Sequence, residues 1–227
     1  MNFNNRSRSI LFLRRDGLDF YEDKSGRILL FPFSREVVSS MEIINVEEFR
    51  KQIKAFIEAN RVLAADIIIV LSADVLFEKD IQTQDPNIQV QETQKFLDLV
   101  PFDSISTKVI PGQGGVRIIA VNRNLVDVLK ASFEEMEFLV DGMVPYEALD
   151  QTLWGINSLN IETSKTIVGQ FDSLKEASFD FERSENKIAP KADLQKDTKG
   201  KIPRVYFMLG VFVLLLVILA FLILTSV

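Results

Sequence analysis

The feature that most constrains this 227-residue chain is a long apolar run near its C-terminal end. Residues 205–226 contain no charged side chain and no proline. About twenty such residues, rising ~1.5 Å each, cross the hydrocarbon core of a bilayer as one helix that satisfies its own backbone hydrogen bonds. The alternative, a buried core helix, would need a large protein around it. We therefore expect a transmembrane helix over residues 204–227, anchored by Arg204, Val205, Tyr206, Phe207, Leu214, Leu215, Ile218, Phe221 and Leu224.

Charged residues on either side of the chain's main part predict its orientation. Residues 187–204 carry six Lys or Arg and two Asp, and basic residues beside a span stay on the cytoplasmic side of the membrane. The first residues do not resemble a signal peptide, because their short apolar segment runs into Arg14, Arg15 and Asp16. We therefore expect a single-pass protein whose N-terminal domain is cytoplasmic.

Composition narrows the classes of function. The net charge is −6, and because residues 187–204 are basic, residues 1–186 hold about −10 and should repel nucleic acid and anionic lipid. The chain has no cysteine and no histidine, which excludes disulfides and thiolate chemistry and removes the commonest general base and metal ligand. These absences favour a non-catalytic protein without a cofactor and without a nucleic-acid partner.

Local patterns predict a mixed α/β domain. Residues 9–13, 18–22 and 27–33 are β-rich and separated by turns that contain Gly17 and Gly26, which predicts a three-stranded meander. Asn45 and Glu48 predict the start of an amphipathic helix that reaches about Asn60. The continuous apolar run 66–71 is typical of a central strand covered on both faces.

The following elements are expected in the order strand, helix, hairpin, helix, strand, helix. We expect them at residues 75–81, 92–100, 106–110 with 116–121, 125–136 and 138–144, and in a last helix that Pro145 opens toward Trp154. From residue 155 the periodicity fades. We therefore expect residues 155–203 to form an extended or disordered tether that is basic at its end.

Two glycine-containing turns could be interpreted as phosphate-binding loops. The turn from Arg14 to Gly17 holds one glycine and no cluster of hydroxyl residues. Residues 111–115 hold three glycines but no following helix that begins with Lys and Ser or Thr. Plain hairpin turns are therefore the favoured interpretation of both.

The element order resembles the ribonuclease-H-like half of the actin fold, over residues 1–154 with a small α+β insert at about 73–121. Within it, residues 69–81, 92–105 and 116–126 resemble the PilM and GspL families, the actin-like cytoplasmic platform proteins of type IV pilus and type II secretion machines. The family's phosphate-binding start, Asp-Ile-Gly with small hydroxyl residues, is replaced here by Leu13, Arg14, Arg15, Asp16 and Gly17. No nucleotide-binding residue therefore carries over, and the second actin-like half is replaced by the expected tether and anchor.

The resemblance implies a non-catalytic, membrane-anchored scaffold in the bacterial inner membrane. Its expected partners are the bilayer, through residues 205–226, and other inner-membrane platform proteins or a cytoplasmic motor ATPase, in homo- or hetero-oligomers. Two alternatives stay open: a membrane-tethered ATP-binding protein in which Asp16 or Asp66 holds Mg²⁺ through water, and an unrelated tail-anchored adaptor.

The same resemblance directs attention to the end of the insert's helix. In the families concerned, the insert and the adjoining groove receive a short segment of a partner, which makes Phe96, Pro101 and Phe102 the expected partner-binding residues. Phe102 could instead fill the core. In that case the acidic helix around Glu134, Glu135 and Glu137 is the next candidate surface.

Overall fold

The computed structural model describes residues 6–112 and 114–179. The expected anchor at 204–227 and the basic end of the tether lie outside these residues. Within the described ranges, no helix is long and apolar enough to cross a membrane.

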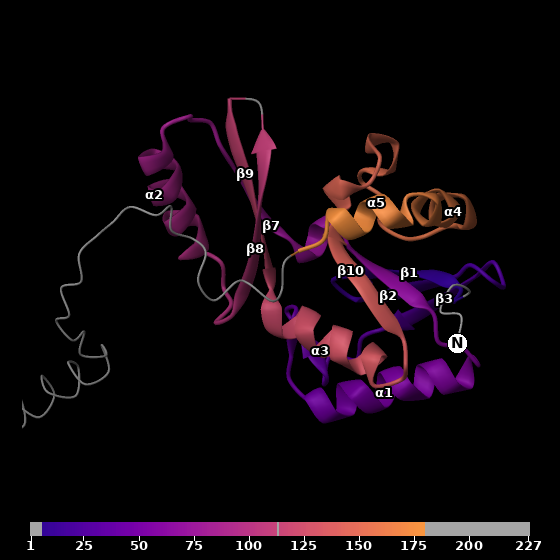
Figure 1. Ribbon diagram of the computed structural model, residues 1–227. Coiled ribbons are helices and arrows are strands. Elements are labelled where there is room, and N and C mark those ends of the chain that lie inside the picture. Colours follow the sequence, from indigo (N-terminus) through magenta and orange to yellow (C-terminus); the bar gives the residue numbers. More distant parts are fainter. Residues whose placement is uncertain (1–5, 113, 180–227) are drawn as a thin grey trace, which may run out of the picture. The chain divides into compact units, whose positions relative to one another are not determined.

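The domain is built on a five-stranded mixed sheet (Figure 1), in the order β10-β6-β1-β2-β3. Strands β1, β6 and β10 are parallel to one another, and β2 and β3 continue the sheet as antiparallel neighbours of β1. The predicted meander and the predicted central strand are both confirmed, and the order agrees with the expected ribonuclease-H-like half. The strands are β1 (Arg8–Arg14), β2 (Gly17–Glu22), β3 (Arg27–Pro32), β6 (Asp66–Leu71) and β10 (Leu139–Pro145).

Helices cover both faces of this sheet (Figure 1). On one face, α1 (Val46–Ala59) and α3 (Arg123–Glu134) bury Phe49 and Phe133 against strand residues such as Phe20. On the other face, α4 (Ile161–Gly169) and α5 (Phe171–Glu176) bury Ile167 and Phe171 in a second core cluster. Alternate residues of β1 and β6 enter the two clusters because successive strand side chains point to opposite faces.

The second helical layer corrects the predicted start of the tether at residue 155. Residues 161–169 and 171–176 are helical, and Leu159, Leu174 and Phe179 are buried, so the folded domain continues at least to Phe179. Asn160 caps α4 by accepting a hydrogen bond from the Thr163 amide at 2.9 Å. The prediction was wrong here because helices of nine and six residues are too short to show a clear period.

The predicted insert is present as a three-stranded antiparallel sheet, in the order β7-β9-β8, with one helix. It consists of β7 (Phe77–Ile81), α2 (Pro86–Leu97), β8 (Ile105–Gly112) and β9 (Gly115–Asn122), preceded by the 3₁₀ turn η1 (Ala73–Val75). Helix α2 begins six residues earlier than expected. Asp85 caps it by accepting from the Asn87 amide at 2.9 Å, and Pro86 occupies its first turn.

The expected α-helix after Pro145 is replaced by two 3₁₀ turns, η2 (Tyr146–Ala148) and η3 (Gln151–Leu153). Pro145 is the last residue of β10 and pairs with Leu71 of β6, so it ends a strand and opens no helix. A two-residue ladder between β4 (Val38–Ser39) and β5 (Glu42–Ile43) was also not predicted.

Candidate functional site

The β1–β2 turn is a hairpin, as the favoured interpretation expected. Arg14 pairs with Gly17 across it, and the Arg14 side chain donates to Asp16 at 2.9 Å. A Cβ on Gly17 would lie 2.5 Å from the carbonyl oxygen of Phe31, so this glycine permits the close approach of β2 and β3. The turn's glycine is thereby explained by strand pairing.

The two carboxylates considered for Mg²⁺ lie far apart. Asp16 follows the end of β1, whereas Asp66 begins β6, and β1 and β6 run parallel, so the two residues are at opposite ends of the sheet. Burial, followed by the nearby Asp141 carboxylate, raises the pKa of Asp66. In the described part of the chain, no group of three or more Asp and Glu side chains is arranged to hold a metal ion.

Of the three residues predicted to bind a partner, two are buried and one is exposed. Phe96 is buried, and Phe102 is only 9% exposed and packs edge-to-face on Phe77 with ring centroids 5.5 Å apart. Pro101 is exposed. This burial favours the core interpretation of Phe102, which also contributes to the lining of a cavity of about 190 Å³ beside Asp103 and Asn122. Partner binding by Phe96, Pro101 and Phe102 stays a prediction.

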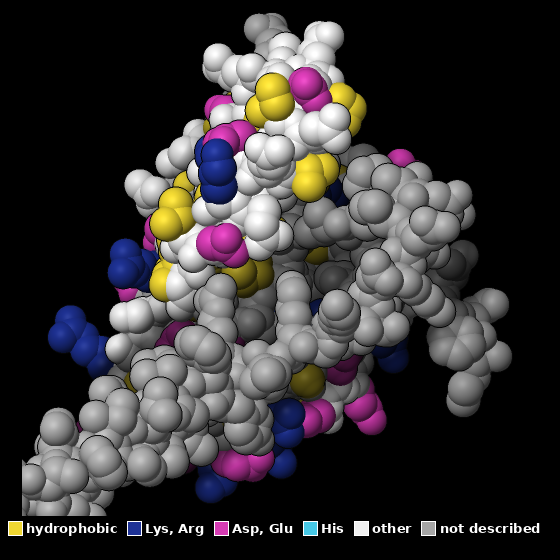
Figure 2. All heavy atoms as spheres, turned by 90° about the vertical axis from the view of Figure 1, so that its left-hand side faces the viewer, with side chains coloured by type: hydrophobic (Ala, Val, Ile, Leu, Met, Phe, Trp, Pro, Cys, Tyr) yellow, Lys and Arg dark blue, Asp and Glu magenta, His cyan; other side chains and the backbone are white. Residues whose placement is uncertain are grey.

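The alternative acidic surface at the end of α3 is exposed but partly neutralised. Arg50 lies 3.0 Å from Glu135, and Lys130 lies 3.8 Å from Glu134. The outer side of the insert carries isolated exposed apolar side chains among polar ones (Figure 2), including Ile88 and Val90 of α2. Arg50 and Glu135 line a cavity of about 260 Å³ between α1 and α3, whose other charged residues are Glu47, Lys51 and Lys54.

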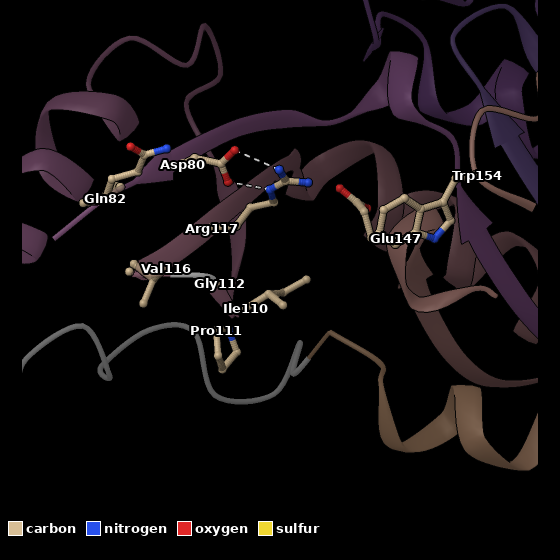
Figure 3. Close-up of a pocket in the computed structure, with 11 residues that line it drawn as sticks. Asp80, Gln82, Ile110, Pro111, Gly112, Val116, Arg117, Glu147 and Trp154 are labelled. Carbon is tan, nitrogen blue, oxygen red and sulfur yellow. Dashed lines mark hydrogen bonds and ion pairs between the residues drawn. The ribbon is translucent and has the colours of Figure 1, made fainter. Parts of the chain in front are cut away.

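A cavity of about 400 Å³ lies between the insert and the turns η2 and η3 (Figure 3). The register of the insert's sheet places Glu78, Asp80, Lys108 and Arg117 on one face, and this face is turned toward the main domain. The cavity is lined by Asp80, Ile81, Gln82, Ile110, Pro111, Gly112, Gly115, Val116, Arg117, Glu147 and Trp154.

Gly115 lines the cavity at the tip of the β8–β9 hairpin. A Cβ at Gly115 would lie 1.9 Å from the carbonyl oxygen of Ile81, so any other residue would push β9 away from β7. The glycine-rich hairpin that could have been a phosphate loop therefore builds one wall of the cavity, and Gly112 pairs with Gly115 at its tip.

Arg117 is the cation of the cavity wall. Its Nε and Nη2 donate to the two carboxylate oxygens of Asp80 at 2.6 and 2.8 Å, and Figure 3 shows this bidentate pair. These hydrogen bonds raise the pKa of the Arg117 guanidinium further above its ordinary value. A second carboxylate, that of Glu78, lies 3.9 Å from Nη1.

Glu147 faces this wall from η2, and its carboxyl group points toward Arg117 (Figure 3). Both of its oxygens are buried, and no donor among the described residues hydrogen bonds to either of them. Burial first, and then the neighbouring carboxyl of Glu78, raises the pKa of Glu147 to about 7. The same surroundings, burial first and then the Glu147 and Glu78 carboxylates, raise the pKa of Tyr146 to about 12.

Lys108 joins the insert to the main domain beside the cavity. Its ammonium group donates to the carbonyl oxygens of Ala177 and Ser178 at the end of α5, the latter at 2.8 Å, and burial lowers its pKa. The Phe179 amide in turn donates to the Met143 carbonyl of β10 at 2.8 Å. The insert is therefore held to the folded C-terminal segment as well as to the sheet.

The lining of the cavity combines apolar and charged side chains. Its apolar residues include Ile110, Pro111, Val116 and the half-exposed Trp154, whose indole donates to the Leu149 carbonyl at 3.0 Å. Ile110 pairs with Arg117 and therefore lies on the same face of the insert's sheet as Arg117 and Asp80. Binding pockets usually have an apolar lining with a few converging polar groups. A carboxyl group with a shifted pKa is a further sign of a functional site.

Sequence reasoning singled out the hairpin 111–115 as a possible loop but not the charged residues of the cavity. The predicted strand 75–81 and the predicted hairpin already contained two of these charged residues, Asp80 and Arg117. Glu78 and Asp80 are two positions apart, so they point to the same face of the strand. Only the register of β7 against β9 brings Asp80 to Arg117, and only the fold brings Glu147 to both.

The described architecture is thus a mixed α/β domain with an α+β insert and a cavity beside it.

No protein-family model matches the chain, and no curated protein matches it. Among solved structures, the chain is similar to the PilM-PilN type IV pilus biogenesis complex, with 12% identity and a TM-score of 0.43 over 63% of this chain and 48% of that chain.

Two further solved structures are similar at the same level. One is the cytoplasmic domain of EpsL, an inner membrane component of the type II secretion system of Vibrio cholerae, with 11% identity, a TM-score of 0.38, and coverage of 64% of this chain and 60% of that one. The other is a Bacteroides thetaiotaomicron protein with an actin-like ATPase fold, with 10% identity, a TM-score of 0.37, and coverage of 65% and 55%. The chain spans from about half to three fifths of the length of these structures.

Proposed function

We propose that this protein is a non-catalytic, membrane-anchored scaffold of a type IV pilus or type II secretion-like assembly platform in the bacterial inner membrane. It binds another platform protein or the cytoplasmic motor ATPase, and residues 205–226 hold it at the bilayer. The cavity between the insert and η2–η3 receives a short segment of that partner.

The observation that carries the proposal is the cavity's position and lining. The insert stands where the sequence resemblance expects the small subdomain, and the cavity beside it has apolar residues together with a few charged ones, which is the usual lining of a binding pocket. Phe96 and Phe102 are buried and do not line this cavity.

A site-specific crosslink tests the partner site. A photoreactive amino acid in place of Gln82, an exposed residue of the cavity's lining, should crosslink to a platform protein or the motor ATPase in native membranes. The same amino acid at Lys24, exposed in the β2–β3 turn, is the matched control. Equal crosslinking at both positions, or none at Gln82, would contradict this use of the cavity.

Fractionation tests the anchor. The full chain should resist carbonate extraction from membranes, whereas a chain truncated after Lys201 should be released, because it lacks the apolar run 205–226. A truncated chain that stays in the membrane pellet would mean that another part of the protein anchors it.

The non-catalytic part of the proposal is tested with nucleotide. The β1–β2 turn carries Arg14, Arg15 and Asp16 in place of a phosphate loop, so the full chain should show no saturable binding of Mg²⁺-ATP at millimolar concentration. A stoichiometric micromolar constant in calorimetry, about −8 kcal/mol, would favour the ATP-binding alternative instead.

A further inference from the structure

Two carboxyl groups meet across the boundary between the insert and the main domain. Glu78 projects from β7 of the insert, and Glu147 projects from η2. Each oxygen of Glu147 exposes less than 1 Å² and has no hydrogen-bond donor among the described residues. Figure 3 shows the Glu147 carboxyl turned toward Arg117, and the Glu78 carboxyl lies 3.9 Å from the same guanidinium, so the two carboxyl groups approach one cation from the two sides of the boundary. Two ionised carboxylates cannot hydrogen bond to each other, so a proton on one of them is needed for a bond between them.

The surrounding charges do not replace this proton. The titratable and charged groups around Glu147 are Tyr146 on η2, Glu78 and Asp80 on β7, and Arg117 on β9. Arg117 donates two hydrogen bonds to Asp80 and lies 3.9 Å from Glu78, so one guanidinium serves three carboxyl groups. When all three are ionised, two negative charges remain uncompensated in a partly buried space, which disfavours the closed contact.

We propose that the contact between η2 and the insert is a proton-operated latch, in which a proton shared by Glu78 and Glu147 holds the cavity closed on this side and its loss lets the insert move away. Below neutral pH the pair carries the proton and its hydrogen bond joins β7 to η2. Above neutral pH the two carboxylates repel each other.

The second attachment of the insert determines what the latch moves. Lys108 lies on the same face of the insert's sheet as Arg117 and stays bound to the Ala177 and Ser178 carbonyls. Loss of the proton therefore opens the cavity at Glu147, while the Lys108 contact keeps the insert attached. The consequence for partner binding rests on the proposed function, whereas the latch itself can be measured without a partner.

The chain contains its own reporter for this test. Trp154 is the single tryptophan, it lines the cavity at 44% exposure, and its ring lies 6.5 Å from that of Tyr146. The chain has no histidine and no cysteine, so apart from the terminal amine no unperturbed group titrates near neutral pH. A change in Trp154 fluorescence near pH 7 can therefore be assigned to Glu147 by the single substitution Glu147→Gln.

The experiment follows Trp154 emission and acrylamide quenching of the full chain, purified in detergent, from pH 5.5 to 8.5. We expect one transition with a midpoint of about 7 and greater quenching on the alkaline side. Glu147→Gln should abolish the transition. Glu78→Gln should move its midpoint to lower pH by at least about one unit, because the like charge is gone while the burial remains. Glu162→Gln, at the exposed start of α4, is the matched control and should leave the midpoint unchanged.

Two results would overturn the latch. One is a parent protein whose Trp154 signal is flat across this pH range, and the other is a transition that persists in Glu147→Gln. Neither result bears on the Gln82 crosslink, so the scaffold proposal would not be affected. A failed crosslink with an intact titration would remove the proposed partner site and keep the latch.

Discussion

Replacement of Asp19 tests how the second helical layer is attached to the sheet. The Asp19 side chain on β2 is fully buried. Its Oδ1 accepts a hydrogen bond from Arg14 Nε at 3.0 Å, and its Oδ2 accepts one from the backbone amide of Leu159 at 2.8 Å. This carboxylate therefore joins β1 and β2 to the segment that leads into α4. Asp16 is the natural comparison, because it pairs with the same arginine at 2.9 Å but is 76% exposed.

The structure predicts very different costs for the two alanine substitutions. Asp19→Ala leaves the Nε of Arg14 and the buried Leu159 amide without an acceptor, while Arg14 Nη1 keeps its bond to Asp16, and losing one partner of a buried ion pair costs about 3–5 kcal/mol. Asp16→Ala should cost about 0.5 kcal/mol or less, as is usual for exposed pairs. A domain's whole unfolding free energy is about 5–15 kcal/mol, so the first variant should lose a third or more of it.

Urea denaturation of the chain truncated after Lys201 measures both variants, with circular dichroism for the whole domain and Trp154 fluorescence for the nearby segment. Asp19→Asn is a useful third variant, because the amide oxygen can still accept from Leu159 while the charge is lost, and its cost should be intermediate. If Asp19→Ala and Asp16→Ala agree within about 0.5 kcal/mol, the buried carboxylate is not what holds the segment, and the reasoning is refuted.

Three further predictions follow from burial and charge. Phe102→Ala should lower the unfolding free energy by about 3–5 kcal/mol, whereas Leu99→Ala, at a side chain 80% exposed, should change it by less than about 0.5 kcal/mol; equal melting temperatures would contradict the core position of Phe102. Truncation after Trp154 removes α4 and α5 and should yield an aggregating protein, in contrast to truncation after Lys201; a monomeric, cooperatively melting short form in gel filtration and calorimetry would disprove this. The folded-state pKa of Glu147 is raised from 4.5 to about 7, so its contribution to stability is full below pH 4.5 and is lost as pH rises from there through 7. Denaturation between pH 4.5 and 8 should therefore show a loss of about 1–2 kcal/mol after allowance for solvent screening, and Glu147→Gln should remove that loss.

Several elements were determined by the sequence alone, because their causes are local. The turn glycines and β-rich runs predicted the meander, the Asn45 cap with Glu48 predicted α1, and the run 66–71 predicted the buried strand β6. The insert's strand–helix–hairpin order was also predicted. Periodicity, caps and turn residues act within a few positions of one another, so a single chain segment is enough to reveal them.

The position of every functional group was decided by the tertiary structure. Residues 155–179 gave no clear period, and they fold because the sheet's second face, with Ile10 and Phe12, needs a cover. The burial of Phe102, the Asp19 contact with Leu159 and the meeting of Glu78 with Glu147 join residues that are far apart in sequence or on different elements. Such contacts depend on strand register and on which faces are turned toward each other, and neither is encoded in the spacing of residues along one segment.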